Sequence, residues 1–274
     1  MKFVKTLVAT GLALAVGITA ASAAAYPKNK PREQDWTFAG PFGKYDRAQL
    51  QRGFKVYQEN CSACHGLQRV SFRNLSDLGF NDDQIKELAS QYEVEDGPNE
   101  FGEMFMRPAN AADQFPWIFQ NREEAVSALG AYPPDMSLLA KARHVERGFP
   151  TFVFDIFTQY AEAGPDYIYS LLTGYKEPPE GSNIPDTLYY NPYFVAGEAL
   201  AMAQPIYDDG IEYDDGTPAT MDQQARDVAA FLMWAAEPKL EQRKETGFRV
   251  MVFLIIFAAF LYMSKKQVWS RIEH

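Results

Sequence analysis

The chain has 274 residues, and its 36 acidic side chains against 26 basic ones give a formal net charge of −10. This charge argues against a nucleic-acid partner and suits a basic protein partner. With only two cysteines, the chain has too few thiolates for a Cys₄ zinc or iron–sulfur site.

Residues 1–25 have the pattern of a cleaved secretory signal peptide. Lys2 and Lys5 precede an apolar run over residues 7–18, and Ala21-Ser22-Ala23 is an A-x-A cleavage site. The alternative is a short N-terminal membrane anchor, for which the apolar run is short. We therefore expect the mature protein outside the cytoplasmic membrane.

A helix is predicted over residues 46–60, with Asp46 as its N-cap. Gly53 lies on the apolar face of this helix, where a missing side chain would let another helix cross closely. The apolar face is formed by Leu50, Phe54 and Tyr57.

The helix leads into Cys61-Ser62-Ala63-Cys64-His65, a C-x-x-C-H sequence. Two thiols three residues apart on one helical turn can both add to the vinyl groups of one porphyrin, and the histidine can bind the iron. A disulfide or a thioredoxin-like C-x-x-C is the alternative, but neither requires His65 and no βαβ pattern surrounds the motif. The motif predicts one covalent haem c, with His65 as an iron ligand.

The rest of the exported region, residues 26–245, fits one elaborated domain. An acidic turn is expected from residue 93 to 100. The predicted helices are 81–91; 122–129, ended by Gly130; 136–144, capped by Asp135; an aromatic segment at 149–163; 165–173, ended by Gly174; and 221–237, stopped by Pro238.

The second axial position of the iron needs methionine, histidine or an open site. Met202 is favoured because small residues flank it and a proline follows at position 205, but Met221 and His144 remain alternatives. The other methionines of the exported region are Met104, Met106, Met136 and Met233.

An apolar segment near the C-terminus predicts one transmembrane helix over residues 246–264. Lys265 and Lys266 follow it, and Trp269 suits the membrane interface. Because the signal peptide exports the domain, the tail 265–274 is expected in the cytoplasm. The alternative is a buried core helix.

Ordered motifs along most of the chain resemble the cytochrome c1 family, the haem subunit of the quinol–cytochrome c oxidoreductase (bc1) complex. Gly53 and Tyr57 stand eight and four residues before Cys61, as in class I cytochromes c. The resemblance implies a mostly α fold: a class I cytochrome c-like haem domain with long insertions, plus one C-terminal transmembrane helix. The matching stretches are 61–65, 96–100, 102–108, 133–135, 142–144, 166–167, 170–175, 191–194, 201–203 and 214–221.

The resemblance also implies roles for individual residues. Met202 would be the sixth iron ligand, although Gln204 replaces a family proline. Arg143 would pair with a haem propionate, and Tyr167 would lie close to one. His144 would then be a structural neighbour. An insertion at 145–163 departs from the shorter family members.

The function implied is electron transfer within a bc1 complex. The chain would accept an electron from a Rieske iron–sulfur protein and pass it to a basic cytochrome c. It would pack beside cytochrome b in a dimeric complex of the bacterial inner membrane, single-pass, with the haem domain periplasmic. The alternatives are a peroxidase-like haem c enzyme and a gas sensor, each with an open sixth iron position.

Overall fold

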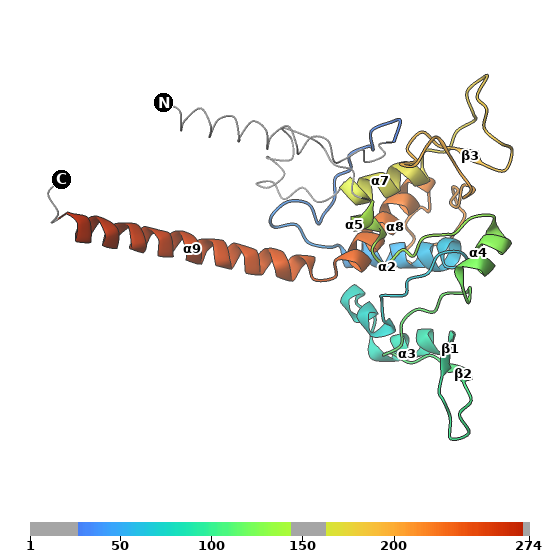
Figure 1. Ribbon diagram of the computed structural model, residues 1–274, viewed down its shortest axis with the longest axis horizontal. Coiled ribbons are helices and arrows are strands. Elements are labelled where there is room, and N and C mark those ends of the chain that lie inside the picture. Colours follow the sequence, from blue (N-terminus) through green and yellow to red (C-terminus); the bar gives the residue numbers. More distant parts are fainter. Residues whose placement is uncertain (1–26, 144–162, 271–274) are drawn as a thin grey trace, which may run out of the picture.

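Helices are the main regular elements of the computed structural model, and one of them, α9 (Leu240–Trp269), extends far from the others (Figure 1). The structure describes residues 27–143 and 163–270. The predicted signal peptide, His144 and nearly all of the aromatic segment lie outside the described residues.

The domain is organised around the crossing of α2 (Arg47–Val56) and α8 (Met221–Ala236). A Cβ atom added at Gly53 would lie only 2.0 Å from the carbonyl oxygen of Asp227 on α8. The two backbones therefore meet at a distance that only glycine allows, as the sequence predicted. Two further helices, α5 (Leu139–Ala142) and α7 (Ala163–Leu172), pack against α8.

A buried aromatic cluster fills the space around this crossing. The ring centroid of Phe231 lies 5.5 Å from that of Phe54, 5.8 Å from that of Tyr57 and 5.6 Å from that of Trp234. All four side chains are at most 2% exposed. Because Tyr57 belongs to the segment that enters the C-x-x-C-H sequence, the core directly supports that motif.

Local capping explains where the helices begin and end. The Asp46 carboxylate accepts hydrogen bonds from the backbone N–H groups of Ala48 and Gln49, which fixes the start of α2. Asn81 forms a capping box on α3 (Asp82–Ser90), and Gly130 ends α4 (Arg122–Leu129) at φ 72°. These caps confirm the predicted starts of α2 and α3 and the predicted end of α4.

Two helix predictions were wrong in extent. The helix expected over 46–60 is α2 only as far as Val56, and a π-helical turn η1 (Tyr57–Cys61) continues it into the motif. The helix expected over 136–144 is only the four-residue α5 within the described part. Asp135 does not cap it, because its two carboxylate oxygens accept from the N–H groups of Gln68 and Ser137.

The acidic segment after residue 93 is a hairpin and not only a turn. Strand β1 (Glu93–Asp96) pairs antiparallel with β2 (Phe105–Pro108), and the hairpin projects from the domain (Figure 1). The Arg107 guanidinium holds it by bonding to Asp96 and, at 2.7 Å, to Asp113. The other elements are a 3₁₀ segment η2 (Phe72–Leu78) and a short pair, β3 (Tyr189–Tyr190) with β4 (Ala199–Leu200).

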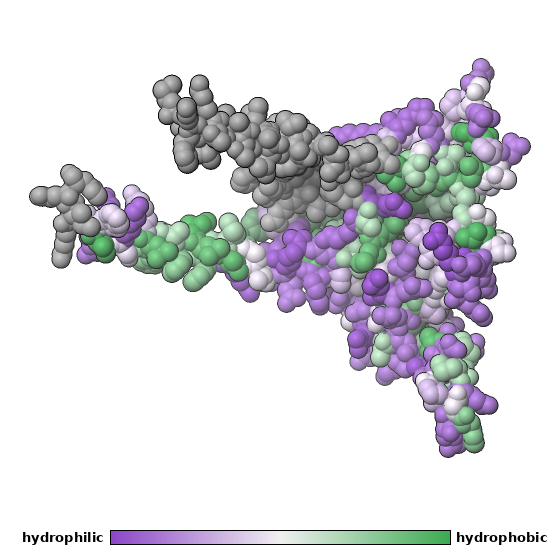
Figure 2. Space-filling model, in the orientation of Figure 1, coloured by the Kyte–Doolittle hydropathy of each residue, from purple (hydrophilic) through white to green (hydrophobic). Residues whose placement is uncertain are grey.

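Helix α9 is one continuous helix of 30 residues, or about 45 Å. In the described part of the chain it is the one helix long and apolar enough to cross a membrane. No residue of its apolar stretch is buried, and the stretch forms a hydrophobic band (Figure 2). Its first turns belong to the domain, since Leu240 is buried and the Lys244 ammonium donates to the Phe38 carbonyl. The apolar stretch is therefore not a core helix of this domain.

Replacement of Gly53 by alanine tests the helix crossing. The new methyl group would overlap the Asp227 carbonyl, so we expect Gly53→Ala to lower the free energy of unfolding by about 1–3 kcal/mol. Guanidinium unfolding of the detergent-solubilised chain, followed by circular dichroism, measures this. Gly197→Ala is the matched control, because a Cβ there meets nothing within 4 Å. If the two variants have the same free energy of unfolding, the close crossing of α2 and α8 is contradicted.

A second test concerns the ion pair at the same crossing. The Arg52 guanidinium donates at 2.9 Å to Asp227, whose side chain is fully buried. Arg52→Gln would leave that carboxylate buried without its cation and should cost about 3 kcal/mol in the same unfolding assay. Lys55→Gln, which breaks a pair with the 89% exposed Asp214, should change stability little. If Arg52→Gln leaves the free energy of unfolding unchanged, the pair contributes nothing to stability.

Candidate haem attachment site

The C-x-x-C-H sequence folds as one tight turn at the end of the π-helical segment. The N–H groups of Cys64 and His65 both donate to the Cys61 carbonyl, at 3.1 and 2.9 Å. This turn keeps the i and i+3 thiols of Cys61 and Cys64 on one side, and neither is in a disulfide. Burial raises the pKa of the unmodified Cys61 thiol to about 12, so it is protonated before modification.

His65 is held in the orientation that an iron ligand needs. Its Nδ1 lies 2.8 Å from the carbonyl oxygen of Pro134. A carbonyl can only accept, so Nδ1 carries the proton and Nε2 keeps its lone pair for a metal. The side chain is 9% exposed, and burial lowers the pKa of His65, which favours the neutral form.

Two neighbours fix this turn from either side. The buried Tyr57 hydroxyl donates to the His65 carbonyl at 3.0 Å. On the other side, Met136 N–H donates to the Gly66 carbonyl at 2.8 Å, so the segment carrying Pro134 is tied to the motif. Sequence analysis assigned neither Tyr57 nor Pro134 to the site. The 133–135 motif was visible, but its bond to His65 is formed only in the folded chain.

Met202 lies in the loop after β4, half-buried against the hydrophobic core. The Tyr175 hydroxyl donates to its backbone carbonyl at 3.0 Å and so fixes the loop. This contact joins segments 27 residues apart and was not apparent from the sequence.

The rival methionines are placed differently. Gln204 Nε2 lies 3.4 Å from the Met221 sulfur, which therefore already accepts a hydrogen bond. Met104 and Met106 are exposed on or beside the hairpin, whereas Met136 and Met233 are buried in the core. Gln204, the departure from the family pattern, thus connects the Met202 loop to the start of α8.

Arg143 and Tyr167 come from two elements that pack against each other, α5 and α7. Arg143 follows α5 with its side chain exposed, and Tyr167 lies on α7 with 3% exposure. Burial raises the pKa of the Tyr167 hydroxyl, and the nearby charge of Arg143 opposes that shift. The Tyr167 hydroxyl also accepts from Val195 N–H at 3.4 Å.

The residues of the C-x-x-C-H turn fit a haem better than a metal ion bound by protein side chains alone. Across residues 27–143 and 163–270, no three His, Cys, Asp or Glu side chains cluster to hold a metal. One neutral imidazole beside two unpaired thiols instead suits an iron that is bound by a porphyrin. These residues and the exposed apolar helix α9 define a c-type cytochrome with a membrane anchor.

Comparison with known proteins gives the family. The sequence model of the Cytochrome C1 family matches residues 36–272, and the chain belongs to this family. "Cytochrome c1" of Blastochloris viridis is 44% identical over 277 residues, which cover 98% of each chain. "Cytochrome b/c1" of Bradyrhizobium diazoefficiens is 51% identical over 269 residues, which cover 96% of this chain but only 39% of that protein. "Cytochrome b-c1 complex catalytic subunit, mitochondrial" of Candida albicans is 40% identical over 246 residues, which cover 89% of this chain and 79% of that protein.

The Tyr57 hydroxyl provides a test of how the motif is held. Tyr57→Phe keeps the ring packing but removes the donor to the His65 carbonyl, so we expect a loss of about 1 kcal/mol in stability. Faster amide hydrogen exchange over residues 61–65 should accompany it. The control is Tyr92→Phe, since the Tyr92 ring packs on the same cluster and its hydroxyl has no hydrogen bond with the described residues. If amide hydrogen exchange over residues 61–65 is unchanged in Tyr57→Phe, the Tyr57 hydroxyl does not hold the motif.

Proposed function

We propose that the chain is the electron-transferring haem c subunit of a bc1 complex. The observation that carries the proposal is the C-x-x-C-H turn, in which His65 Nδ1 is bound to the Pro134 carbonyl and Nε2 is left for iron. Family membership supports it, as does the Candida albicans relative, whose name places it in a b-c1 complex. The comparisons give no support to the peroxidase-like enzyme or the gas sensor.

The haem would be held by four protein atoms and two supporting side chains. Cys61 and Cys64 would form the thioethers, and His65 Nε2 and the Met202 sulfur would bind the iron. The iron of the bound haem supplies a reversible one-electron change, and a His/Met pair raises its potential. Arg143 neutralises a propionate, with Tyr167 beside it. The support for Met202 is its half-buried loop, whereas the Met221 sulfur is engaged by Gln204.

The redox partners are a Rieske iron–sulfur protein as donor and a basic cytochrome c as acceptor. The exposed carboxylates of the β1–β2 hairpin support an acidic docking surface. Asp214 and Asp215 contribute less to such a surface, because they pair with Lys55 and Arg52. Exposed acidic residues of the hairpin are Glu93, Glu95, Glu100 and Glu103.

The chain is anchored in the bacterial inner membrane, with α9 beside cytochrome b in a dimeric complex. The span 246–264 crosses the bilayer, the haem domain is periplasmic, and the tail from residue 265 is cytoplasmic. A cleaved signal peptide over residues 1–25 sets this orientation. The exposed apolar band of α9 supports the crossing.

Replacement of Met202 tests the ligation and with it the carrier function. Met202→Leu removes the sulfur donor, so the midpoint potential should fall on the order of hundreds of millivolts and the reduced haem should bind carbon monoxide. Redox titration and visible spectra of the purified chain measure both.

Met221→Leu is the matched control, because it removes a methionine of the same region that is bound to Gln204. Its potential should stay close to that of the unmodified chain, and its reduced form should not bind carbon monoxide. If the unmodified chain binds carbon monoxide when reduced, the sixth position is open and the carrier function is wrong. If the Met221→Leu substitution alone lowers the potential, Met221 is the ligand.

A further inference from the structure

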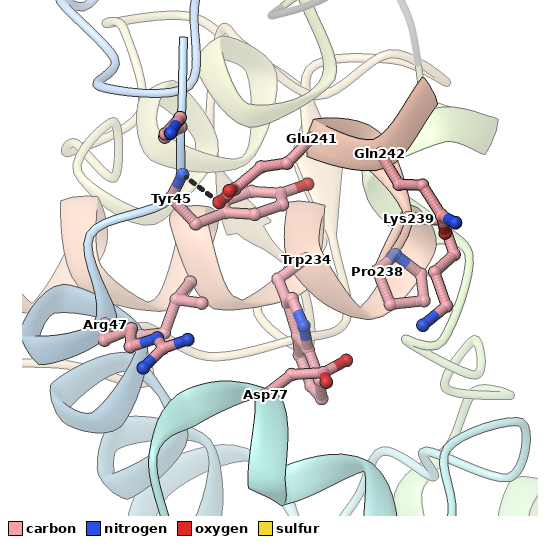
Figure 3. A pocket seen from close by; sticks show the side chains of 10 residues that line it. Tyr45, Arg47, Asp77, Trp234, Pro238, Lys239, Glu241 and Gln242 are labelled. Carbon is pink, nitrogen blue, oxygen red and sulfur yellow. Dashed lines mark hydrogen bonds between the residues drawn. The ribbon is translucent and has the colours of Figure 1, made fainter. Parts of the chain in front are cut away.

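A pocket of about 410 Å³ lies where the domain meets the membrane helix (Figure 3). The start of α2, the end of α8 and the first turn of α9 line it, together with Asp77 of η2. It is separate from the C-x-x-C-H turn and has no part in the proposed electron transfer. We call it the membrane-proximal pocket.

The pocket contains three cationic side chains that form no ion pair within the described residues. Lys44, Arg47 and Lys239 line it, and their side chains make no hydrogen bond or ion pair with the described residues. Two carboxylates also line it, so the five charged side chains sum to +1. Glu241 is already occupied, because its Oε1 accepts from Tyr45 N–H at 3.0 Å. The net charge suits a ligand with one negative charge.

A second observation points to a missing ligand. The Trp234 side chain lines the pocket and is 2% exposed, yet its indole N–H has no acceptor in the part of the chain that the structure describes. Buried polar groups in proteins are nearly always hydrogen-bonded. Figure 3 shows the indole ring beside Asp77 and below Tyr45. An oxygen of a bound ligand, or a water on it, would satisfy this N–H group.

The height of the pocket above the membrane identifies the ligand. Phe42, which is 70% exposed, packs its ring 5.4 Å from that of Phe248, just before the charge-free part of α9. If α9 crosses a bilayer, these rings lie at the edge of its hydrocarbon layer. Glu241 stands seven residues earlier on α9, or about 10 Å above Phe248. Lys44 lies in the loop between those two levels, so its long side chain reaches the headgroup layer.

We propose that the membrane-proximal pocket binds the phosphate headgroup of an anionic phospholipid, in the leaflet on the side of the haem domain. Lys44 and Arg47 hold the phosphate, and the acyl chains descend along Phe42 and Phe248. The loop that carries Phe42 is clamped to α9 by the bonds from Lys244 to Phe38 and from Tyr45 to Glu241. A bound lipid would therefore fix the height of the domain above the bilayer. This inference rests on the proposed crossing of the membrane by α9.

The test uses the full-length, haem-loaded chain, freed of lipid in detergent and titrated with phosphatidylglycerol. Native mass spectrometry gives the affinity for the most tightly bound lipid. Since each basic side chain near a membrane surface contributes about fivefold, Lys44→Gln/Arg47→Gln should weaken this affinity roughly 10- to 30-fold. Lys86→Gln/Lys176→Gln removes the same charge from exposed positions outside the pocket and should leave the affinity unchanged.

Two further measurements separate the lipid from other ligands. Phe42→Ser should weaken phosphatidylglycerol binding several-fold, because only a lipid has acyl chains to contact that ring. Excess inorganic phosphate should not displace the lipid; full displacement would mean a site for a soluble anion and would overturn the proposal. Equal lipid affinity in the pocket variant and in the unmodified chain would also overturn it.

Alkaline carbonate extraction of membranes distinguishes failure of the lipid-site proposal from failure of the proposed membrane anchor. If carbonate releases the unmodified chain, α9 does not cross the membrane, and the proposed anchor fails together with the lipid site. If the chain stays in the membrane but its lipid affinity does not depend on Lys44 and Arg47, only the lipid site is wrong. The visible spectrum of each variant confirms that its haem domain is folded.

Discussion

The close crossing of α2 and α8 is the contact on which the rest of this structure depends. At Gly53 the backbone of one helix reaches the backbone of the other, and the buried pair of Arg52 with Asp227 lies at the same level. A buried carboxylate is tolerated there only because its cation and the Gln223 side chain bind it. The crossing in turn packs Tyr57 against Phe231, which directs the π-helical turn and the C-x-x-C-H sequence onto the core.

Long loops carry the remaining groups of the candidate site, and single hydrogen bonds to backbone carbonyls hold them. The Pro134 carbonyl accepts a hydrogen bond from His65 Nδ1, and the Met202 carbonyl accepts one from the Tyr175 hydroxyl. Such bonds fix a loop without adding a charged side chain to it. Gln204 adds a bond that a proline at its position could not make, because its amide reaches both the Ile206 carbonyl and the Met221 sulfur.

The membrane helix is a rigid extension of the domain and not a tethered anchor. Its first turn packs Leu240 into the core, and Lys244 bonds to a carbonyl of the loop that precedes α2. The same few turns therefore join the haem domain, the loop with Phe42 and the bilayer. A subunit that passes electrons between partners benefits from such a connection, because tunnelling requires each partner at a defined height and orientation.

The sequence by itself determined the features that depend on local chemistry. The C-x-x-C-H spacing, the caps at Asp46 and Gly130, the glycine on the apolar face of α2 and the apolar run of α9 can all be read from residues near one another in the chain. Only the tertiary structure decided which residues hold these local features in place. The bond from His65 to Pro134 spans 69 residues, and that from Tyr175 to Met202 spans 27. The acidic segment is a hairpin in which Arg107 bonds to both Asp96 and Asp113. The distant partners of His65 and Tyr175 are chosen by packing of the whole chain, and no local pattern encodes them.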